Sequence, residues 1–304
     1  MLEIQPYAAN RWWVAGLLAA FTAALIVAAD ILVARRDHGA GLVPPRPGDP
    51  EAPASLSGPF GLAWRLHRAS LLGWAVGLFA LGAMYGGVAG GVGDLLAETP
   101  ELEEIFRQIG GDQPLIDAFF ATTMAIAGLI TSGYVIGATL RIRAEEIGLR
   151  AEQVLATSVG RTPWALSHAV VALGGAVVLL VATGVGAGLT HGARIGDVAG
   201  QMSILVGAAV VQLPAVMVLG ALALTLIGLV SRMTGLAWFA LVAFLVLGQL
   251  GALLQLEQWL MNVSPFTHLP ASPSEQLTAQ PLVALVAVAL GAVGLAGLRA
   301  RDVG

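Results

Sequence analysis

Long apolar runs constrain this chain more than any other feature of its sequence. A transmembrane helix needs about 20 mostly apolar residues, and seven runs meet or approach that length: Trp12–Ala34, Ser70–Val92, Asp117–Leu140, Ala165–Thr190, Met202–Val230, Leu236–Gln255 and Pro281–Leu298. Charged residues make up only 11% of the chain, against about 25% in soluble domains. The sequence therefore predicts an all-α integral membrane protein with about seven transmembrane helices.

The arginines indicate how these spans are oriented, because loops on the cytoplasmic side of a membrane retain positive charge. All 15 basic residues are arginines, and with seven spans one side holds only Arg11, Arg107 and Arg194. The others fall on the opposite side: Arg35, Arg36, Arg46, Arg65, Arg68, Arg141, Arg143, Arg150, Arg161, Arg232, Arg299 and Arg301. We therefore predict a multi-pass protein of a bacterial plasma membrane, with its N-terminus outside and its C-terminus in the cytoplasm.

The stretch between the first two spans has the composition of a linker. Residues 35–63 are rich in proline and glycine, and such a composition cannot build a packed core. We therefore divide the chain into a leading span (1–34), a cytoplasmic linker (35–63) and a block of six spans (64–304). An outside N-terminus with no earlier span is unusual, so we expect an upstream segment or a separate chain to precede it.

The residue types that are missing exclude several kinds of chemistry. The chain has no lysine, and a P-loop needs a lysine to reach the phosphates of ATP. It has no cysteine, which excludes disulfides and thiol catalysis. We therefore expect no catalytic residue, no bound cofactor and no enzymatic activity in this chain, and any ATP-driven function requires a separate ATPase subunit.

The ionisable residues support neither a metal site nor an ion-coupled carrier. The five histidines are scattered and form no H-E-x-x-H motif, so we predict no metal ligands. His168 follows Trp164 at the membrane face, where we expect it to be an interfacial anchor. Asp30 is the one acid in the interior of a predicted span, and it lies near Arg35. A local salt bridge is the simpler interpretation of Asp30 than a proton relay.

The small and polar residues inside the spans leave two interpretations open. Gly82, Gly86 and Gly90 are four residues apart, a spacing that favours close helix packing. Further small and polar residues could line a substrate path or could bond between helices: Thr131, Ser132, Gln212 and Gln249. No substrate-binding residue is assigned on this basis.

The charged segment between the third and fourth spans, residues 141–164 (RIRAEEIGLRAEQVLATSVGRTPW), has the pattern of a cytoplasmic amphipathic helix. Its apolar side would hold Ile147, Ala151, Val154, Leu155 and Val159, and its polar stripe Glu146, Arg150, Gln153 and Thr157. Glu146 and Arg150 would form an i,i+4 ion pair, Gly160 would close the helix and Pro163 would open the next span. The helix could lie on the membrane surface or dock in a groove of a cytoplasmic motor, and physical reasoning alone favours the first.

The same segment resembles the corresponding loop of actinobacterial ABC type-2 permeases that export polyketide antibiotics, the tetronasin-like group. The shared pattern comprises Arg143, Ala144, Glu145, Glu146, Arg150, Glu152, Leu155, Ala156, Thr157, Val159, Arg161, Trp164, Ser167 and His168. The stretches ARRDHGAGLVPPRPG, LAWRLHRASLLGWAVG and LEQWLMNVSPFTHLP…LRARDVG resemble that family too. Its members are about twice as long, and this chain resembles their C-terminal half, with residues 64–304 as a six-span permease half.

The resemblance implies the transmembrane permease subunit, or half-subunit, of an ATP-driven exporter of hydrophobic antibiotic-like compounds. Its implied partners are an ABC ATPase subunit that binds ATP and Mg, another permease half or a second permease copy, and membrane lipid, with no nucleic acid. The ATPase-coupling residues would be Glu145, Glu146, Arg150, Glu152, Gln153, Thr157 and Arg161. A non-transporting membrane scaffold or assembly subunit is the alternative, and a membrane-embedded enzyme has the least support.

Overall fold

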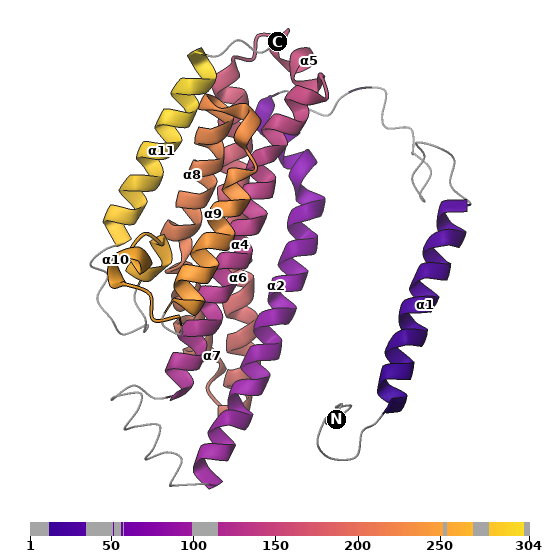
Figure 1. The fold of residues 1–304 in the computed structure, drawn as a ribbon, viewed down its shortest axis with the longest axis vertical. Coiled ribbons are helices and arrows are strands. Elements are labelled where there is room, and N and C mark those ends of the chain that lie inside the picture. The colour runs from indigo at the N-terminus through magenta and orange to yellow at the C-terminus, as the bar shows by residue number, and fades with distance from the viewer. Residues whose placement is uncertain are drawn as a thin grey trace. The chain divides into compact units, whose positions relative to one another are not determined.

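The structure is a computed structural model that describes residues 12–34, 51, 56, 58–98, 115–251, 254–269 and 280–300 (Figure 1). The chain divides into two units, residues 1–52 and residues 53–304. Most of the predicted linker lies outside the described residues, as do Arg11, Arg35, Arg36, Arg46, Arg107 and Arg301.

The first unit contains one described helix, α1 (Trp12–Ala34). Its apolar stretch, Ala15–Ala34, has no buried residue. Large apolar side chains such as Leu18 and Phe21 are exposed along it. A helix that is apolar all round is suited to a membrane interior, which agrees with the predicted leading span.

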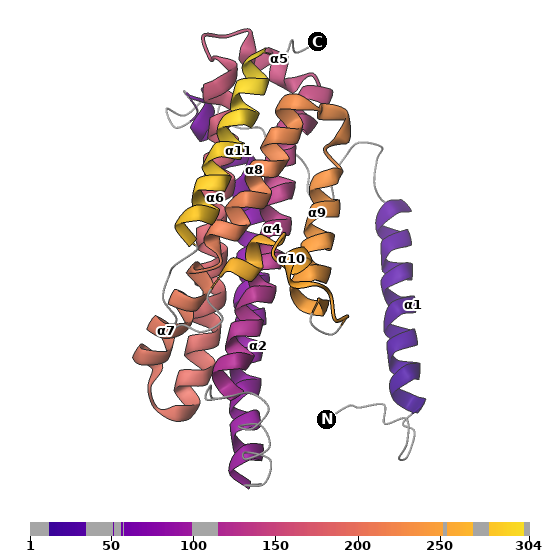
Figure 2. The ribbon, with the colours of Figure 1, turned by 60° about the vertical axis from the view of Figure 1, so that its left-hand side comes forward.

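The second unit is a bundle of long helices that run side by side (Figures 1 and 2). Its elements are α2 (Pro59–Glu98), α4 (Leu115–Ile147), α5 (Arg150–Leu155), α6 (Arg161–Ile195), α7 (Val198–Val210), α8 (Leu213–Leu229), η2 (Ser231–Met233), α9 (Leu236–Leu245), η3 (Val246–Leu250), α10 (Gln258–Met261), η4 (Pro265–His268) and α11 (Gln280–Ala300). The described residues include no strand. The predicted all-α class is therefore confirmed.

Among the described residues, six helical stretches are long and apolar enough to cross a membrane: Ala15–Ala34, Pro59–Ala89, Ile116–Ile147, Arg161–Ile195, Val198–Leu229 and Gln280–Ala300. The remaining predicted span, Leu236–Gln255, contains a shorter apolar helix, Leu236–Gly248. There the α-helix α9 passes into the π-helix η3, and Gln255 has a positive φ of 53°. A count of seven spans therefore stays a prediction.

The helices extend beyond the apolar runs on which the predicted spans were based. α2 begins at Pro59 instead of Ser70, and α4 continues to Ile147 instead of Leu140. Hydropathy ends a span at the first charged turn, whereas a helix continues for as long as its backbone can hydrogen-bond. The charged ends of α2 and α4 therefore belong to the helices themselves.

Glycines let α2 and α6 pack closely. A Cβ added at Gly82 or Gly86 would collide with the backbone of Thr183 or Ala187 in α6. The hydroxyl of Thr190 also donates to the carbonyl of Ala83 at 2.9 Å. This agrees with the small-residue packing predicted at these two glycines; the surroundings of Gly90 lie outside the described residues.

Most of the described arginines lie at one end of the second unit, the end that carries α5 in Figure 1, whereas Arg194 lies at the other end, in the last turn of α6. Arg65 and Arg68 lie near the start of α2, Arg141 and Arg143 near the end of α4, and Arg299 at the end of α11. Alternate connections therefore share an end, as predicted for this unit. Which end faces the cytoplasm stays a prediction.

Candidate functional site

Residues 141–164, here called the elbow, form two helix ends and a short helix between them. α4 ends at Ile147, Leu149 adopts a left-handed conformation with φ 56°, and α5 starts at Arg150. A Cβ at Gly148 would lie 2.8 Å from the Arg150 guanidinium and 3.1 Å from the Ala144 carbonyl oxygen. Glycine at position 148 avoids this crowding. Because the backbone turns at Leu149, the prediction of one continuous helix is wrong.

The far side of the elbow also differs from the expectation. Gly160 has φ −72° and ψ 158°, and it is the N-cap of α6 rather than the end of the preceding helix. Pro163 lies in the first turn of α6, as predicted. Proline is tolerated there because the backbone N–H groups of that turn have no intrahelical partner.

Ion pairs tie the elbow together. Arg150 donates from Nε to Glu145 Oε2 at 2.7 Å and from Nη2 to Glu145 Oε1 at 3.3 Å. Arg141 Nε lies 3.5 Å from the same carboxylate, and Arg143 Nη1 donates to Glu146 Oε2 at 3.1 Å. The expected Glu146–Arg150 pair is thus replaced by Glu145–Arg150, because the break at Leu149 cancels the helical spacing on which it was based.

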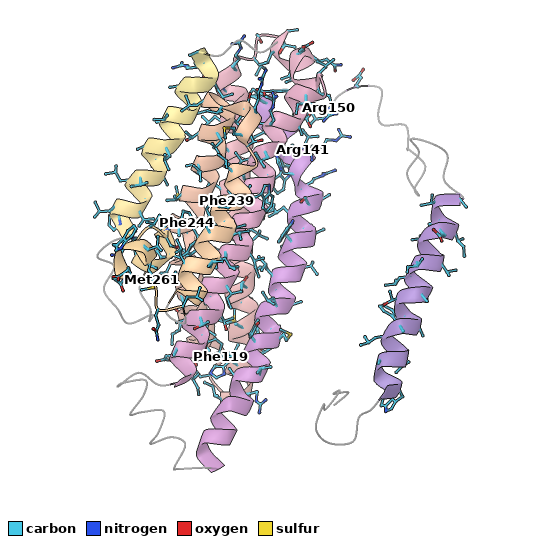
Figure 3. All side chains as sticks on the ribbon, viewed as in Figure 1. Phe119, Arg141, Arg150, Phe239, Phe244 and Met261 are labelled. Carbon is cyan, nitrogen blue, oxygen red and sulfur yellow. The ribbon has the colours of Figure 1, made fainter. Side chains whose placement is uncertain are left out.

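Two of the three acids of the elbow, Glu145 and Glu146, are buried beside guanidinium groups. Glu145 and Glu146 are each 7% exposed. Buried carboxylates are costly unless they are paired with cations, and guanidinium groups supply that pairing here. The Glu145 carboxylate raises the pKa of Arg150 above its ordinary value through its hydrogen bond and its negative charge. The pair therefore holds the start of α5 against the end of α4. Figure 3 labels Arg141 and Arg150 at this end of the bundle.

The helix α5 has one packed side and one free side. Ala151 is 1% exposed and belongs to an apolar cluster with Ile142 and Trp164, against which Val154, Leu155 and Val159 pack. Ile147, expected on the same side, is 68% exposed, because it precedes the break. The predicted coupling residues on the other side are exposed: Arg150, Glu152, Gln153 and Thr157; Arg161 is half-buried.

A histidine pair lies beneath the elbow, and the sequence did not reveal it. His67 Nε2 of α2 and His168 Nδ1 of α6 are 3.0 Å apart and buried. The Trp164 ring meets the His168 ring edge-on, with centroids 5.7 Å apart. His168 is therefore packed inside the bundle instead of anchoring the interface. The two histidines are 101 residues apart, and no local motif marks such a pair.

The polar side chains in the middle of the spans differ in how they are bonded. Ser132 donates to the carbonyl of Gly128 in its own helix at 2.9 Å. Thr131 Oγ1 and Gln212 Oε1 are buried without a hydrogen-bond partner among the described residues. The Gln249 side chain lies outside the described residues. No group of three or more His, Cys, Asp or Glu that could hold a metal ion occurs in the part of the chain that the structure describes.

Comparison with known proteins places this bundle in a family. Residues 56–299 match the family model described as "Multidrug efflux system permease Rv1217c, C-terminal domain". The chain belongs to that family. It is 45% identical over 304 residues to the multidrug efflux system permease protein Rv1217c of Mycobacterium tuberculosis (strain ATCC 25618 / H37Rv). That match covers 99% of this chain and 56% of the relative, so the chain spans about half the length of the curated relative it matches.

Membership of this multidrug permease family supports the broader part of the resemblance seen in the sequence. An ABC permease family and a multi-pass membrane protein follow from the match and from the apolar helices. The narrower tetronasin-like group stays a prediction.

Proposed function

We propose that this chain is the permease subunit, or half-subunit, of an ATP-driven ABC exporter in a bacterial plasma membrane. It would move hydrophobic antibiotic-like compounds out of the cell, with its arginine-rich end in the cytoplasm. The observation that carries the proposal is the elbow: a short helix with a polar, exposed side, tied by buried charges to the end of a long membrane helix. Its family membership supports the same function.

The contacts of the elbow would transmit a displacement of α5 to the other helices of the bundle. The exposed side of α5 presents Glu152 and Gln153 to a partner. Glu145 and Arg150 join the start of α5 to α4, and Ala151 seats α5 on the apolar cluster. Because packed helices move as rigid bodies, a displacement of α5 would tilt α4. The His67–His168 contact lies beside the elbow and joins α2 to α6, so those helices would follow.

The partners follow from what this chain lacks. ATP and Mg²⁺ would be bound by a separate ATPase subunit, since this chain has no lysine for a P-loop. The exposed coupling residues, together with Glu145, Glu146 and Arg161, would form or support its docking surface. A second permease half or copy would complete the pathway, membrane lipid would surround the bundle, and no nucleic acid is involved. A non-transporting scaffold or assembly subunit is the alternative, and the family match does not favour it.

Co-purification with the candidate ATPase tests the proposal. We expect the detergent-solubilised chain to capture the ATPase, and we expect Glu152→Arg to reduce that capture about tenfold, because it reverses a charge on the exposed side of α5. Asp117→Arg is the matched control, since Asp117 is an exposed acid in the first turn of α4 and therefore at the opposite end. Glu145→Ala should also weaken capture, by releasing α5 from α4.

Two outcomes would contradict the proposal. If Glu152→Arg and Asp117→Arg capture the ATPase as well as the wild type does, the elbow is a membrane-surface anchor. If the wild-type chain never captures an ATPase, the scaffold alternative replaces the exporter.

A further inference from the structure

The membrane span Val198–Leu229 is broken near its middle. α7 ends at Val210 and α8 begins at Leu213. Pro214, in the first turn of α8, has no backbone N–H to continue the helical ladder. The Val211 carbonyl accepts a hydrogen bond of 3.4 Å from Gln280 Nε2 of α11. Val211 and Gln212 keep right-handed helical backbone angles, so the span is kinked here and not unwound, and a proline kink frees a backbone carbonyl from its helical partner.

Gln212 lies in this break, and its side chain packs against α4. A Cβ added at Gly128 would lie 3.0 Å from Gln212 Cβ and 3.2 Å from Gln212 Oε1. Seven residues further along α4, Val135 fills the space in front of Gly220 of α8. These residues define the α4–α8 contact.

Thr131 belongs to the same contact. Gly128, Thr131 and Val135 follow the i, i+3, i+7 spacing that places residues on one helix face. Thr131 therefore lies about one turn from Gly128 along α4, next to the contact with α8. It is also the central residue of α4, with 16 residues on either side. Thr131 and the break at Gln212 are therefore at the middle of their spans.

The side chains of Thr131 and Gln212 are both buried, and each has a polar oxygen with no compensating hydrogen bond among the described residues. Thr131 is fully buried and Gln212 is 5% exposed. Neither Thr131 Oγ1 nor Gln212 Oε1 has a hydrogen-bond partner within the described part of the protein. A buried polar atom without a partner lowers stability, whereas an apolar group of the same shape does not. The neighbouring Ser132 shows the usual solution, a bond to its own helix.

We propose that Thr131 and Gln212 form a contact site for the exported compound inside the membrane. When α4 and α8 part during the transport cycle, Gln212 Oε1 and Thr131 Oγ1 accept hydrogen bonds from the compound. Because the Gln212 amide oxygen can only accept a hydrogen bond, the site favours hydrophobic compounds that carry an N–H or O–H donor. This inference rests on the proposed export function and adds the chemical class of its substrates.

Binding of two hydrophobic cations to the whole purified chain in detergent tests the site. Ethidium carries two aromatic amino groups that donate hydrogen bonds, and tetraphenylphosphonium carries no donor. We expect the double variant Thr131→Val/Gln212→Leu to weaken ethidium binding about tenfold, the equivalent of one or two hydrogen bonds. Tetraphenylphosphonium binding should change less than about twofold. Ser132→Ala, which removes an adjacent hydroxyl that is already bonded, should alter neither.

Thermal unfolding supplies a second readout. Since the two oxygens have no partner in the folded chain, the double variant should melt at or above the wild-type temperature. A fall of several degrees would show that they are bonded within the protein and would overturn the site. Equal losses for both cations, unchanged ethidium binding, or a wild type that binds ethidium no better than empty micelles would overturn it as well.

Transport into vesicles that hold the chain and its ATPase separates this inference from the proposed function. If the double variant transports both cations as well as the wild type does, the contact site is overturned and the exporter stands. Selective loss of ethidium binding without any transport of either cation supports the site and overturns the exporter.

Discussion

The elbow and the α4–α8 contact both bury polar side chains, yet they differ in how that burial is compensated. At the elbow, the buried carboxylates of Glu145 and Glu146 meet the guanidinium groups of Arg150 and Arg143 within 3.1 Å. At the α4–α8 contact, in the middle of the membrane, the oxygens of Thr131 and Gln212 meet no donor among the described residues. Paired charges hold the elbow in one arrangement, although its Arg141 Nε meets Glu145 only as an ion pair at 3.5 Å. An unpaired polar atom away from any charge partner is available to a ligand. The first region is therefore suited to transmit force and the second to contact a substrate.

The largest effect is expected from breaking the pairing at the elbow. Glu145→Ala leaves the Arg150 and Arg141 guanidinium groups without their shared carboxylate and releases α5 from α4, so unfolding in detergent should begin several degrees lower. Glu152→Ala, at an exposed position on α5, should leave the melting temperature unchanged. Equal melting temperatures for both variants would show that the buried pair does not hold the elbow.

A smaller loss of stability is expected from adding a methyl group to the α4–α8 contact. Gly128→Ala presses a methyl group against the Gln212 side chain, and such overpacking costs about 1–3 kcal/mol. Gly207→Ala in α7 is the matched control, because a Cβ there meets nothing within 4 Å. Chemical denaturation of the two variants measures the difference. A Gly128→Ala variant as stable as the control would mean that α4 and α8 are loosely packed at this level.

A modest gain in stability is expected from a glycine at Leu149, where the chain turns between α4 and α5. Leu149 holds a left-handed conformation with φ 56°, which costs a residue with a side chain about 1 kcal/mol relative to glycine. Leu149→Gly should therefore raise the free energy of unfolding by up to about 1 kcal/mol while keeping ATPase capture. A loss of stability instead would mean that the exposed Leu149 side chain packs against a partner.

The smallest effect is expected from Thr131→Val alone. Valine has nearly the shape of threonine and removes an oxygen that has no partner, so the melting temperature should not fall. Thr183→Val is the control, because the Thr183 hydroxyl donates to the Leu179 carbonyl at 2.9 Å. If Thr131→Val destabilises the chain more than Thr183→Val does, the contrast between the two regions fails.

Helical content and packing glycines were predictable from the sequence because they depend on local properties. Apolar runs of about 20 residues form helices wherever water is absent. Gly82 and Gly86 show a spacing that places them on one helix face. The order of the spans and the positions of the arginines also predicted that alternate connections between helices lie at the same end of the bundle.

The candidate site was predictable only in part. Residues 141–164 were identified from their charges, and Ala151, Val154, Leu155 and Val159 pack as the pattern indicated. The break at Leu149 and the Glu145–Arg150 pair were missed, because a helical wheel assumes one uninterrupted helix. Polar residues such as Thr131 and Gln212 were visible in the sequence, but their pairing was not.

The sequence by itself determined the class of the molecule, since hydropathy and charge act through the nearest residues and the surrounding solvent. Only the tertiary structure decided which polar groups find partners. The His67–His168 pair and the α4–α8 contact join residues 101 and about 80 positions apart, and such proximity depends on how whole helices cross. A hydrogen bond requires two groups within about 3 Å of each other, and no local pattern of residues specifies that distance.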